Sequence, residues 1–276
     1  MPMDLYPEHL ATLPRPELED AIRRAVQTAY LGDGLVLARI LGRHKIFLRS
    51  ADRGFACHLM LDGYWEIWLT QFLARRVTPG MTAIDVGANF GYFTLLLGDA
   101  VGAAGHVVAV EPNPEAASLL QESVLLNGHR TRTTVVPHAL GASAGRGWLW
   151  APDGEPKNAA LVGTENIPGG TTVEVSTLTL DEVGLAYAKV DLVKIDAEGG
   201  EEGIVAGMRQ LIARDRPTIV LEFNAARYAD PRRFLDELLA SYGTARELSL
   251  DGELLPLDRA SVLDQTSRED RTLLFE

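Results

Sequence analysis

The sequence predicts an α/β fold built on a doubly wound, mostly parallel sheet, with an N-terminal cap before it and an antiparallel hairpin near its C-terminus. Two observations carry this prediction. From residue 81 onward, short apolar runs of strand length alternate with segments of helical period. Short apolar strands joined by helices imply a parallel sheet that is covered on both faces. We expect a cap over residues 1–62 and one α/β domain over residues 63–276.

The cap contains elements that do not follow this alternation. Apolar residues near helical spacing predict a helix over 17–30, and two β-like runs follow at 35–41 and 45–49. A second helical period covers 64–76, and the Pro79-Gly80 pair after it is typical of a helix end. The N-terminal part of the chain is therefore expected to mix helices with short strands.

The α/β domain follows with a regular order of elements. Apolar runs predict strands at 82–86, 107–110, 134–136, 192–195 and 218–223, and helical periods predict helices at 92–100, 114–126 and 203–212. The segment 148–170 is rich in Gly, Pro and Asn, which predicts a loop or a β excursion lying over the sheet. Near the end, Asp251-Gly252 between apolar runs predicts a hairpin over 247–256, and 272–275 is expected to be an edge strand.

Composition and charge favour a soluble cytoplasmic protein. Lys plus Arg number 26 against 38 Asp plus Glu, so the formal net charge is −12. This balance argues against nucleic acid and anionic membrane as partners, because proteins that bind them usually carry a basic stripe. The single cysteine, Cys57, fits a reducing compartment and excludes a cysteine-based zinc site. The most apolar stretch, 83–110, is interrupted by charged residues and glycines, so we expect no membrane span.

The most informative segment is a strand that runs into a glycine-bracketed turn and then into a helix. Gly87 and Gly91 allow the backbone to turn tightly and to approach a ligand, and the helix N-terminus offers unpaired N–H groups. At the end of the second predicted strand, Glu111 can accept hydrogen bonds from both hydroxyls of a ribose. Asp85, at the end of the first strand, can meet an ammonium group of the ligand directly or through water. The alternative is that the two glycines only make a tight turn.

This turn differs from the dinucleotide-binding fingerprint at its middle glycine. Asn89 stands where that glycine lets a pyrophosphate approach the backbone. NAD and FAD are therefore disfavoured, and a ligand without phosphates fits better. S-adenosylmethionine (SAM) is such a ligand, since it combines adenine, ribose, a sulfonium and an amino acid.

Three longer runs resemble the signature motifs of FkbM-type methyltransferases. They are Asp85-Val86-Gly87-Ala88-Asn89-Phe90-Gly91-Tyr92, Glu111-Pro112-Asn113-Pro114 and Lys194-Ile195-Asp196-Ala197-Glu198-Gly199-Gly200-Glu201. Gly63-Tyr64-Trp65-Glu66 and Thr179-Leu180-Asp181 are similar to weaker motifs of that family. The resemblance covers about residues 62–223. It implies a class I, Rossmann-like fold, SAM as methyl donor and, commonly, O-methylation of sugars or natural products.

On that resemblance, the cofactor site can be assigned residue by residue. We expect it to comprise Asp85, Gly87, Ala88, Asn89, Gly91, Glu111 and Asn113, with Ala139 and Leu140 against the adenine. Asn113 has a second reading as the cap of the helix that begins at Pro114. The two roles are compatible.

Polar side chains gather at two further strand ends, where ligands of open α/β sheets bind. Lys194, Asp196 and Glu198 mark one end, and Glu222 and Asn224 mark the other. An ion pair between Lys194 and a carboxylate that stabilises the sheet is one reading, because buried carboxylates require partners. The other reading is catalytic, since methyl transfer to a hydroxyl needs positioning and a general base or a metal.

Asp196, Glu222 and Glu66 are the candidate catalytic residues, and Asp196 is the first choice for the base. A second hypothesis makes Asp196, Glu222 and Asn224 oxygen ligands of Mg²⁺. Glu66 can reach the methionine end of SAM or the acceptor, although a solvated helix position explains it equally well.

Three other functions stay open. A SAM-dependent N-methyltransferase often carries Asn/Asp-Pro-Pro-aromatic after the fourth strand, where this chain has Asp196-Ala197-Glu198-Gly199. A SAM-binding scaffold without catalysis would not need Asp85, Glu111 and Asp196. An NAD-dependent oxidoreductase is disfavoured by Asn89. The favoured prediction is a SAM-dependent O-methyltransferase acting on a hydroxylated small molecule, while the sequence indicates neither the acceptor nor the oligomeric state.

Overall fold

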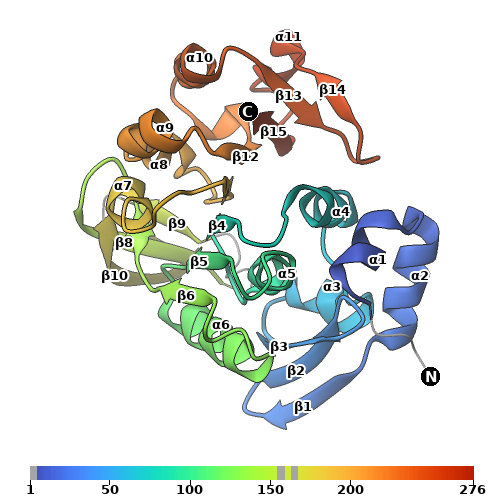
Figure 1. Ribbon diagram of the computed structural model, residues 1–276. Coiled ribbons are helices and arrows are strands. Elements are labelled where there is room, and N and C mark those ends of the chain that lie inside the picture. The colour runs from blue at the N-terminus through green and yellow to red at the C-terminus, as the bar shows by residue number, and fades with distance from the viewer. Residues whose placement is uncertain (1–4, 154–158, 163–166) are drawn as a thin grey trace.

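The computed structural model describes residues 5–153, 159–162 and 167–276, and Figure 1 shows their arrangement. The described residues form an eight-stranded main sheet in the order β14-β13-β15-β12-β11-β4-β5-β6. Its strands are β4 (Thr82–Val86), β5 (His106–Val110), β6 (Thr133–Val136), β11 (Leu192–Ile195), β12 (Thr218–Phe223), β13 (Ala245–Leu248), β14 (Leu254–Pro256) and β15 (Arg271–Phe275). The strands from β6 to β12 are parallel, and antiparallel pairings extend the sheet beyond β12. The predicted class I, Rossmann-like fold is confirmed.

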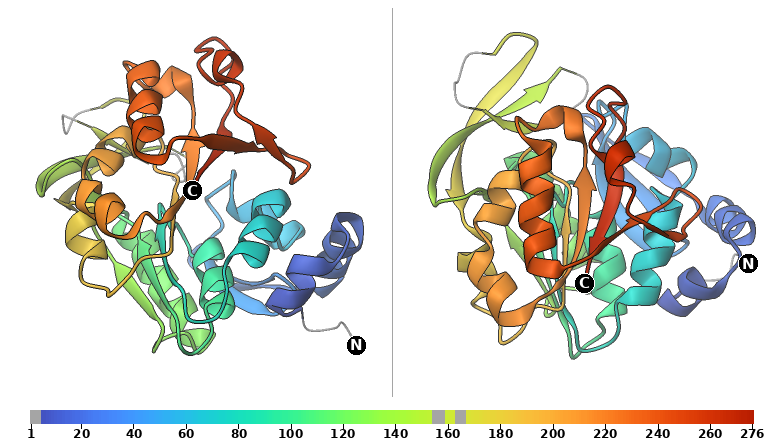
Figure 2. Two further views of the ribbon diagram at one scale, coloured as in Figure 1. Left: turned by 45° about the horizontal axis from the view of Figure 1, so that its top comes forward. Right: turned by 90° about the horizontal axis from the view of Figure 1, so that it is seen from above.

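Helices cover both faces of this sheet, as the two views of Figure 2 make plain. One face packs Ala83 and Leu192 into a core with α4 (Ile67–Arg76) and α5 (Tyr92–Ala100). The next residue of each strand, Ile84 and Val193, lies in a second core formed with other helices. Those helices are α7 (Leu180–Gly184), α8 (Glu201–Ala206), α9 (Arg209–Asp215) and α10 (Pro231–Tyr242). A smaller core joins α6 (Pro114–Leu126) to β5. Successive side chains of a strand point to opposite faces, so the sheet is doubly wound as predicted.

The N-terminal segment forms a three-stranded antiparallel sheet and short helices. Its elements are α1 (Pro7–Thr12), α2 (Arg15–Ala25), β1 (Thr28–Gly32), β2 (Leu35–Ile40), β3 (His44–Arg49) and α3 (Ala56–Leu61). The strands predicted at 35–41 and 45–49 are confirmed. The helix predicted over 17–30 is wrong in its last part, because the backbone becomes extended at Val26 and residues 28–32 pair with β2. Helical spacing within a segment cannot reveal that pairing, which depends on a partner strand.

A second sheet lies beside the main one, at the green and yellow strands of Figure 2. Its four described strands run in the order β7 (Ala139–Leu140), β10 (Gly170–Leu178), β8 (Gly145–Pro152) and β9 (Ala160–Val162). The segment predicted at 148–170 is thus a β excursion where it is described. Residues 154–158 and 163–166 of that prediction lie outside the described residues.

Two predictions about the C-terminal half are wrong. The helix predicted over 203–212 is divided into α8 and α9 at Gly207, whose backbone lies so close to Gly141 that an added Cβ would be 2.2 Å from the carbonyl oxygen. The strand predicted at 272–275 is not at an edge, because β15 pairs with β12 on one side and β13 on the other. The predicted hairpin is confirmed as β13 and β14, and it docks outside β15. A short helix, α11 (Arg259–Val262), lies between β14 and β15 in the chain.

The described residues include no helix that is both long enough and apolar enough to cross a membrane.

Candidate active site

A cavity of about 440 Å³ lies at the carboxyl ends of the parallel strands. Gly87 follows β4, Glu111 follows β5, Asp196 follows β11 and Glu222 lies near the end of β12, and all four line the cavity. Its other walls come from the N-terminal segment and from the second sheet. The volume lies in the range of small-molecule and cofactor sites.

The turn after β4 requires glycine at position 87. The φ angle of Gly87 is 73°, and an added Cβ would lie 1.7 Å from the backbone carbonyl oxygen of Asp196. Asn89 is also left-handed, with φ 50°, a conformation that Asn tolerates better than most residues. Gly91 makes the second tight turn, but it packs against Leu120 and is not part of the cavity wall. Of the two predicted glycines, Gly87 therefore lies in the cavity and Gly91 supports it from behind.

Glu111 is held at the cavity by the backbone around it. Its two carboxylate oxygens accept the N–H groups of Asn89 and Asn113, each at 2.8 Å. Burial raises the pKa of Glu111 to about 7, while those two hydrogen bonds act in the opposite direction. The side chain is only 7% exposed, and it lines the cavity. This carboxylate is pre-oriented by local hydrogen bonds, as a binding group should be.

Asn113 caps α6, as one of its two predicted roles requires, and it stands at the cavity. Its side-chain oxygen accepts the N–H groups of Glu115 and Ala116 at 3.0 and 3.3 Å, which caps α6. It also lines the cavity, as do Ala88, Ala139 and Leu140.

Asp85 lies beneath the cavity and is not part of its wall. The side chain is fully buried, and it accepts the hydroxyl of Thr94 at 2.7 Å. Its other partner is the ammonium of Lys194, 3.5 Å away. Asp85 therefore reaches the cavity only indirectly, through its ion pair with Lys194.

Lys194 joins Asp85 to the cavity. Its ammonium also lies 3.4 Å from Asp196, and its side chain is 3% exposed. Burial opposes the charge of Lys194, but the Asp196 and Asp85 carboxylates outweigh it and raise its pKa. The ion pair anticipated from the sequence is therefore present. It does not remove Asp196 from the cavity, which this carboxylate lines with a 30% exposed side chain.

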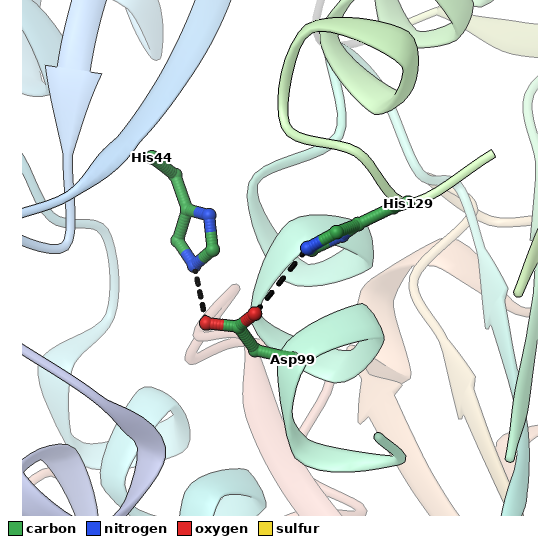
Figure 3. A group of neighbouring side chains, drawn as sticks. All are labelled: His44, Asp99 and His129. Atoms are coloured by element: carbon green, nitrogen blue, oxygen red, sulfur yellow. Dashed lines mark ion pairs between the residues drawn. The ribbon is translucent and has the colours of Figure 1, made fainter. Parts of the chain in front are cut away.

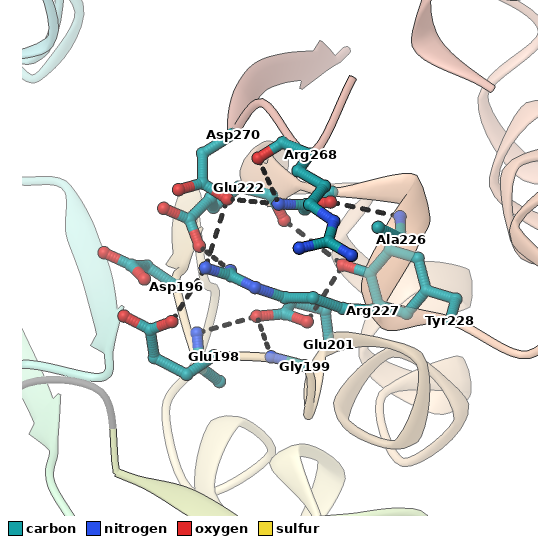
Figure 4. A network of polar contacts seen from close by, with 12 residues as sticks. Asp196, Glu198, Gly199, Glu201, Glu222, Ala226, Arg227, Tyr228, Arg268 and Asp270 are labelled. Carbon is teal, nitrogen blue, oxygen red and sulfur yellow. Dashed lines mark hydrogen bonds and ion pairs between the residues drawn. The ribbon is translucent and has the colours of Figure 1, made fainter. Parts of the chain in front are cut away.

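A second cation, Arg227, holds three further carboxylates of the cavity (Figure 4). It lies 2.6 Å from Glu222, 2.8 Å from Glu198 and 3.1 Å from Asp270. Burial raises the pKa of Glu222, and the Asp196 and Asp270 carboxylates add to this, while Arg227 opposes it. Sequence reasoning missed both Arg227 and Asp270. Arg227 could have been found, because it is the first cation after the acidic end of β12.

The geometry does not fit the predicted Mg²⁺ site. Asn224 is not part of the cavity wall, and its amide is engaged on both sides. The nitrogen donates to the Arg268 carbonyl and to Asp270, at 3.2 and 2.8 Å, and the oxygen accepts the N–H of Ala226 at 3.0 Å. The two remaining candidate ligands, Asp196 and Glu222, already lie against Lys194 and Arg227.

Glu66 also lines the cavity, although the helix predicted over 64–76 begins only at Ile67. Glu66 precedes that helix with a left-handed φ of 39°. It is thus a residue of the turn before α4, and not a solvated position within a helix. Trp65 beside it contributes to the same wall.

A separate group of buried side chains joins the N-terminal sheet to α5 (Figure 3). His44 and His129 lie 3.0 and 3.3 Å from the two carboxylate oxygens of Asp99, close enough to hold a metal ion. Burial lowers the pKa of His129, which favours the neutral imidazole. The negative charge of Asp99 is already compensated, because Arg43 lies 2.8 Å from this carboxylate. The group is better described as a structural hydrogen-bond network than as a metal centre.

Comparisons with known proteins agree with the motif prediction. The family model described as "Methyltransferase FkbM domain" matches residues 85–245. None of the curated proteins compared matches the chain.

Solved structures provide two further likenesses. The chain is similar to the methyltransferase FkbM from Methylobacillus flagellatus KT, at 17% identity and a TM-score of 0.47, over 73% of this chain and 44% of that one. It is also similar to the O-methyltransferase from Bacillus cereus solved in complex with SAH, at 15% identity and a TM-score of 0.40, over 70% of this chain and 72% of that one. The chain thus spans less than half of the length of the Methylobacillus protein.

Proposed function

The chain belongs to the FkbM methyltransferase family, and on that premise we propose that it transfers the methyl group of SAM to a hydroxyl oxygen of a small molecule. The observation that carries this proposal is the cavity. One end of it, at Glu111 and Leu140, is suited to binding a nucleoside, and the other end, at Asp196, is charged. When bound, SAM supplies an electrophilic methyl group on a sulfonium. Every other requirement of the reaction falls to residues of the chain.

The end at Glu111 has the chemistry that binds a nucleoside. Each carboxylate oxygen of Glu111 uses one lone pair on a backbone N–H, and each can accept a ribose hydroxyl as well. Ala139 and Leu140, which are 2% and 4% exposed, offer an apolar surface for adenine. The left-handed Asn89 fills the place of the pyrophosphate-binding glycine, which supports a ligand without phosphates.

The end at Asp196 has the chemistry that activates a hydroxyl. The ammonium of Lys194 lies 3.4 Å from Asp196, and the carboxylate of Asp196 can take the proton of the acceptor hydroxyl as the hydroxyl oxygen attacks. Glu222 is a weaker candidate for the base, because its raised pKa favours the protonated form. We assign Glu222 and Glu66 to orienting the acceptor.

Oxygen is the favoured acceptor atom, because the segment after β11 reads Asp196-Ala197-Glu198-Gly199 and lacks the amide and prolines that orient an amine. A net charge of −12 supports a small molecule over nucleic acid or an anionic membrane as the partner. The single cysteine supports action in the cytoplasm.

Calorimetric titration with S-adenosylhomocysteine (SAH) tests the cofactor. We expect wild-type protein to bind SAH with micromolar affinity, about −8 kcal/mol, and to bind no NAD⁺. Glu111→Ala should weaken SAH binding at least about tenfold, since it removes charge-assisted hydrogen bonds. The control is Glu122→Ala, an exposed glutamate on α6, which should bind like wild type. Folded wild-type protein that binds no SAH would refute the proposal.

A screen of hydroxylated small molecules, read by SAH formation, tests the reaction. Asp196→Asn should abolish turnover of any acceptor found and leave the SAH affinity within about threefold of wild type. Asp251→Asn, in the exposed turn of the hairpin, is the matched control. Turnover of Asp196→Asn near the wild-type rate would exclude Asp196 as the base. Repeating the screen with Mg²⁺ and with EDTA tests the metal hypothesis directly.

A further inference from the structure

Glu201 is a buried carboxylate that is not itself part of the cavity wall. It stands at the start of α8, within the segment 198–202, which contains three glutamates. Its exposed fraction is nevertheless 0%, and it is not among the residues of the cavity wall. A carboxylate is buried only where hydrogen bonds compensate for the lost water, so its partners reveal its role.

Two of these partners are backbone N–H groups of the loop that follows β11. One oxygen of Glu201 accepts the N–H of Ala197 at 2.9 Å and that of Gly199 at 3.2 Å (Figure 4). This loop contains two consecutive left-handed residues, Glu198 with φ 51° and Gly199 with φ 104°. A left-handed glutamate is unfavourable by itself, so the carboxylate of Glu201 compensates for a strained loop.

The third partner comes from a different strand end. The other oxygen of Glu201 accepts the hydroxyl of Tyr228 at 2.9 Å, and Tyr228 directly follows Arg227. Burial and the charge of Glu201 raise the pKa of Tyr228, so this hydroxyl stays a donor. The ring of Tyr228 packs against Phe223 and Phe234 at 5.1 Å, which fixes its position.

Glu201 therefore ties the loop after β11 to the loop after β12. The first loop carries Asp196, whose carbonyl oxygen lies against Gly87, and the second carries Arg227, which holds Glu222. A shift of either loop would move a charged side chain relative to the turn at Gly87. Displacements of about 1 Å at such a site can cost about 100-fold in rate.

We propose that Glu201 is a positioning residue, which sets the place of the Asp196 carboxylate at the transferred methyl through its bonds to Ala197, Gly199 and Tyr228. This inference rests on the proposed function, because it takes Asp196 to face the methyl group. Glu201 itself contacts neither donor nor acceptor. Its effect is carried by the two loops.

Sinefungin tests this without knowledge of the acceptor, because it carries an amino group where SAM carries the transferred methyl. The ratio of the SAH Kd to the sinefungin Kd thus reports how a carboxylate is placed at that point. Asp196→Asn should lower the ratio roughly fivefold, the effect of a partly exposed ion pair. Glu201→Ala should lower it by a similar factor, although Glu201 is outside the cavity, with the SAH Kd itself changed less than about threefold.

Two further variants separate positioning from a general loss of structure. Glu201→Gln should restore the ratio, because its amide oxygen can accept both loop N–H groups while its NH₂ donates to the Tyr228 oxygen. Glu202→Ala is the matched control, since Glu202 stands beside Glu201 and is paired with Arg233 at the surface. It should leave the ratio unchanged.

Amide hydrogen exchange gives a second reading that needs no ligand. Glu201→Ala should speed exchange at Ala197 and Gly199, while Glu202→Ala should not. Unchanged exchange there, or an unchanged ratio in folded Glu201→Ala, would overturn the proposal. It is equally overturned if Asp196→Asn leaves the ratio as in wild type, or if Glu201→Gln lowers it as far as Glu201→Ala. Failure of the proposed function looks different, because wild-type protein would then bind neither SAH nor sinefungin.

Discussion

The buried carboxyl of Glu111 makes cofactor affinity depend on pH. Its pKa is raised to about 7, so the carboxyl is about 90% ionised at pH 8 and about 10% ionised at pH 6. Only the ionised form has acceptors free for both ribose hydroxyls, because two lone pairs are used by the N–H groups of Asn89 and Asn113. The apparent Kd equals the intrinsic Kd divided by the ionised fraction, so it should rise about tenfold from pH 8 to pH 6.

Calorimetric titration with SAH across this pH range measures the effect. At pH 6, binding should also release about one proton, which shows as a dependence of the measured enthalpy on the buffer. Glu111→Gln cannot ionise, so its weaker SAH affinity should not change with pH. His138 lines the same cavity, and a His138→Asn variant separates any imidazole contribution. A wild-type Kd that is constant between pH 6 and pH 8 would refute the reasoning.

Three substitutions test the turn at the site and two structural roles, the Asp99 network and the α6 cap. Gly87→Ala should abolish SAH binding in calorimetry, because its Cβ would lie 1.7 Å from the Asp196 carbonyl oxygen; an affinity within about threefold of wild type would contradict this. Asp99→Ala should lower the free energy of unfolding by about 3 kcal/mol in urea, since His129 and the other donors lose their buried acceptor; a loss below about 1 kcal/mol would show that the network is not stabilising. Asn113→Ala should cost about 1 kcal/mol in the same measurement through loss of the α6 cap, and an unchanged midpoint would exclude that role.

The parts of the site that follow from local sequence were predictable. The turn at Gly87 and the carboxylate of Glu111 come directly after strands, and their roles depend on neighbours within a few residues in the chain or on the next parallel strand. Asp196 and Glu222 were predictable for the same reason, since the ends of parallel strands meet at one edge of the sheet.

Other parts depend on contacts that no local pattern encodes. Asp270 reaches Arg227 only because β15 inserts between β12 and β13, whereas the sequence predicted that strand at an edge. Asn224, predicted as a metal ligand, is held by Arg268 and Asp270 from that same late segment. A misplaced strand thus accounts for both a missed residue and a prediction that the geometry does not favour.

By itself, the sequence determined the alternation of strands and helices, the glycine turn, the cap at Asn113 and the family of the chain. These features depend on backbone preferences and on hydrogen bonds between near neighbours, which are the same wherever the segment folds. Only the tertiary structure decided that Glu201 is buried under the loop of Asp196, and that Arg227 gathers carboxylates from three segments. The energy of a buried charge is set by the groups around it, and those groups are known only once the distant strand ends have met.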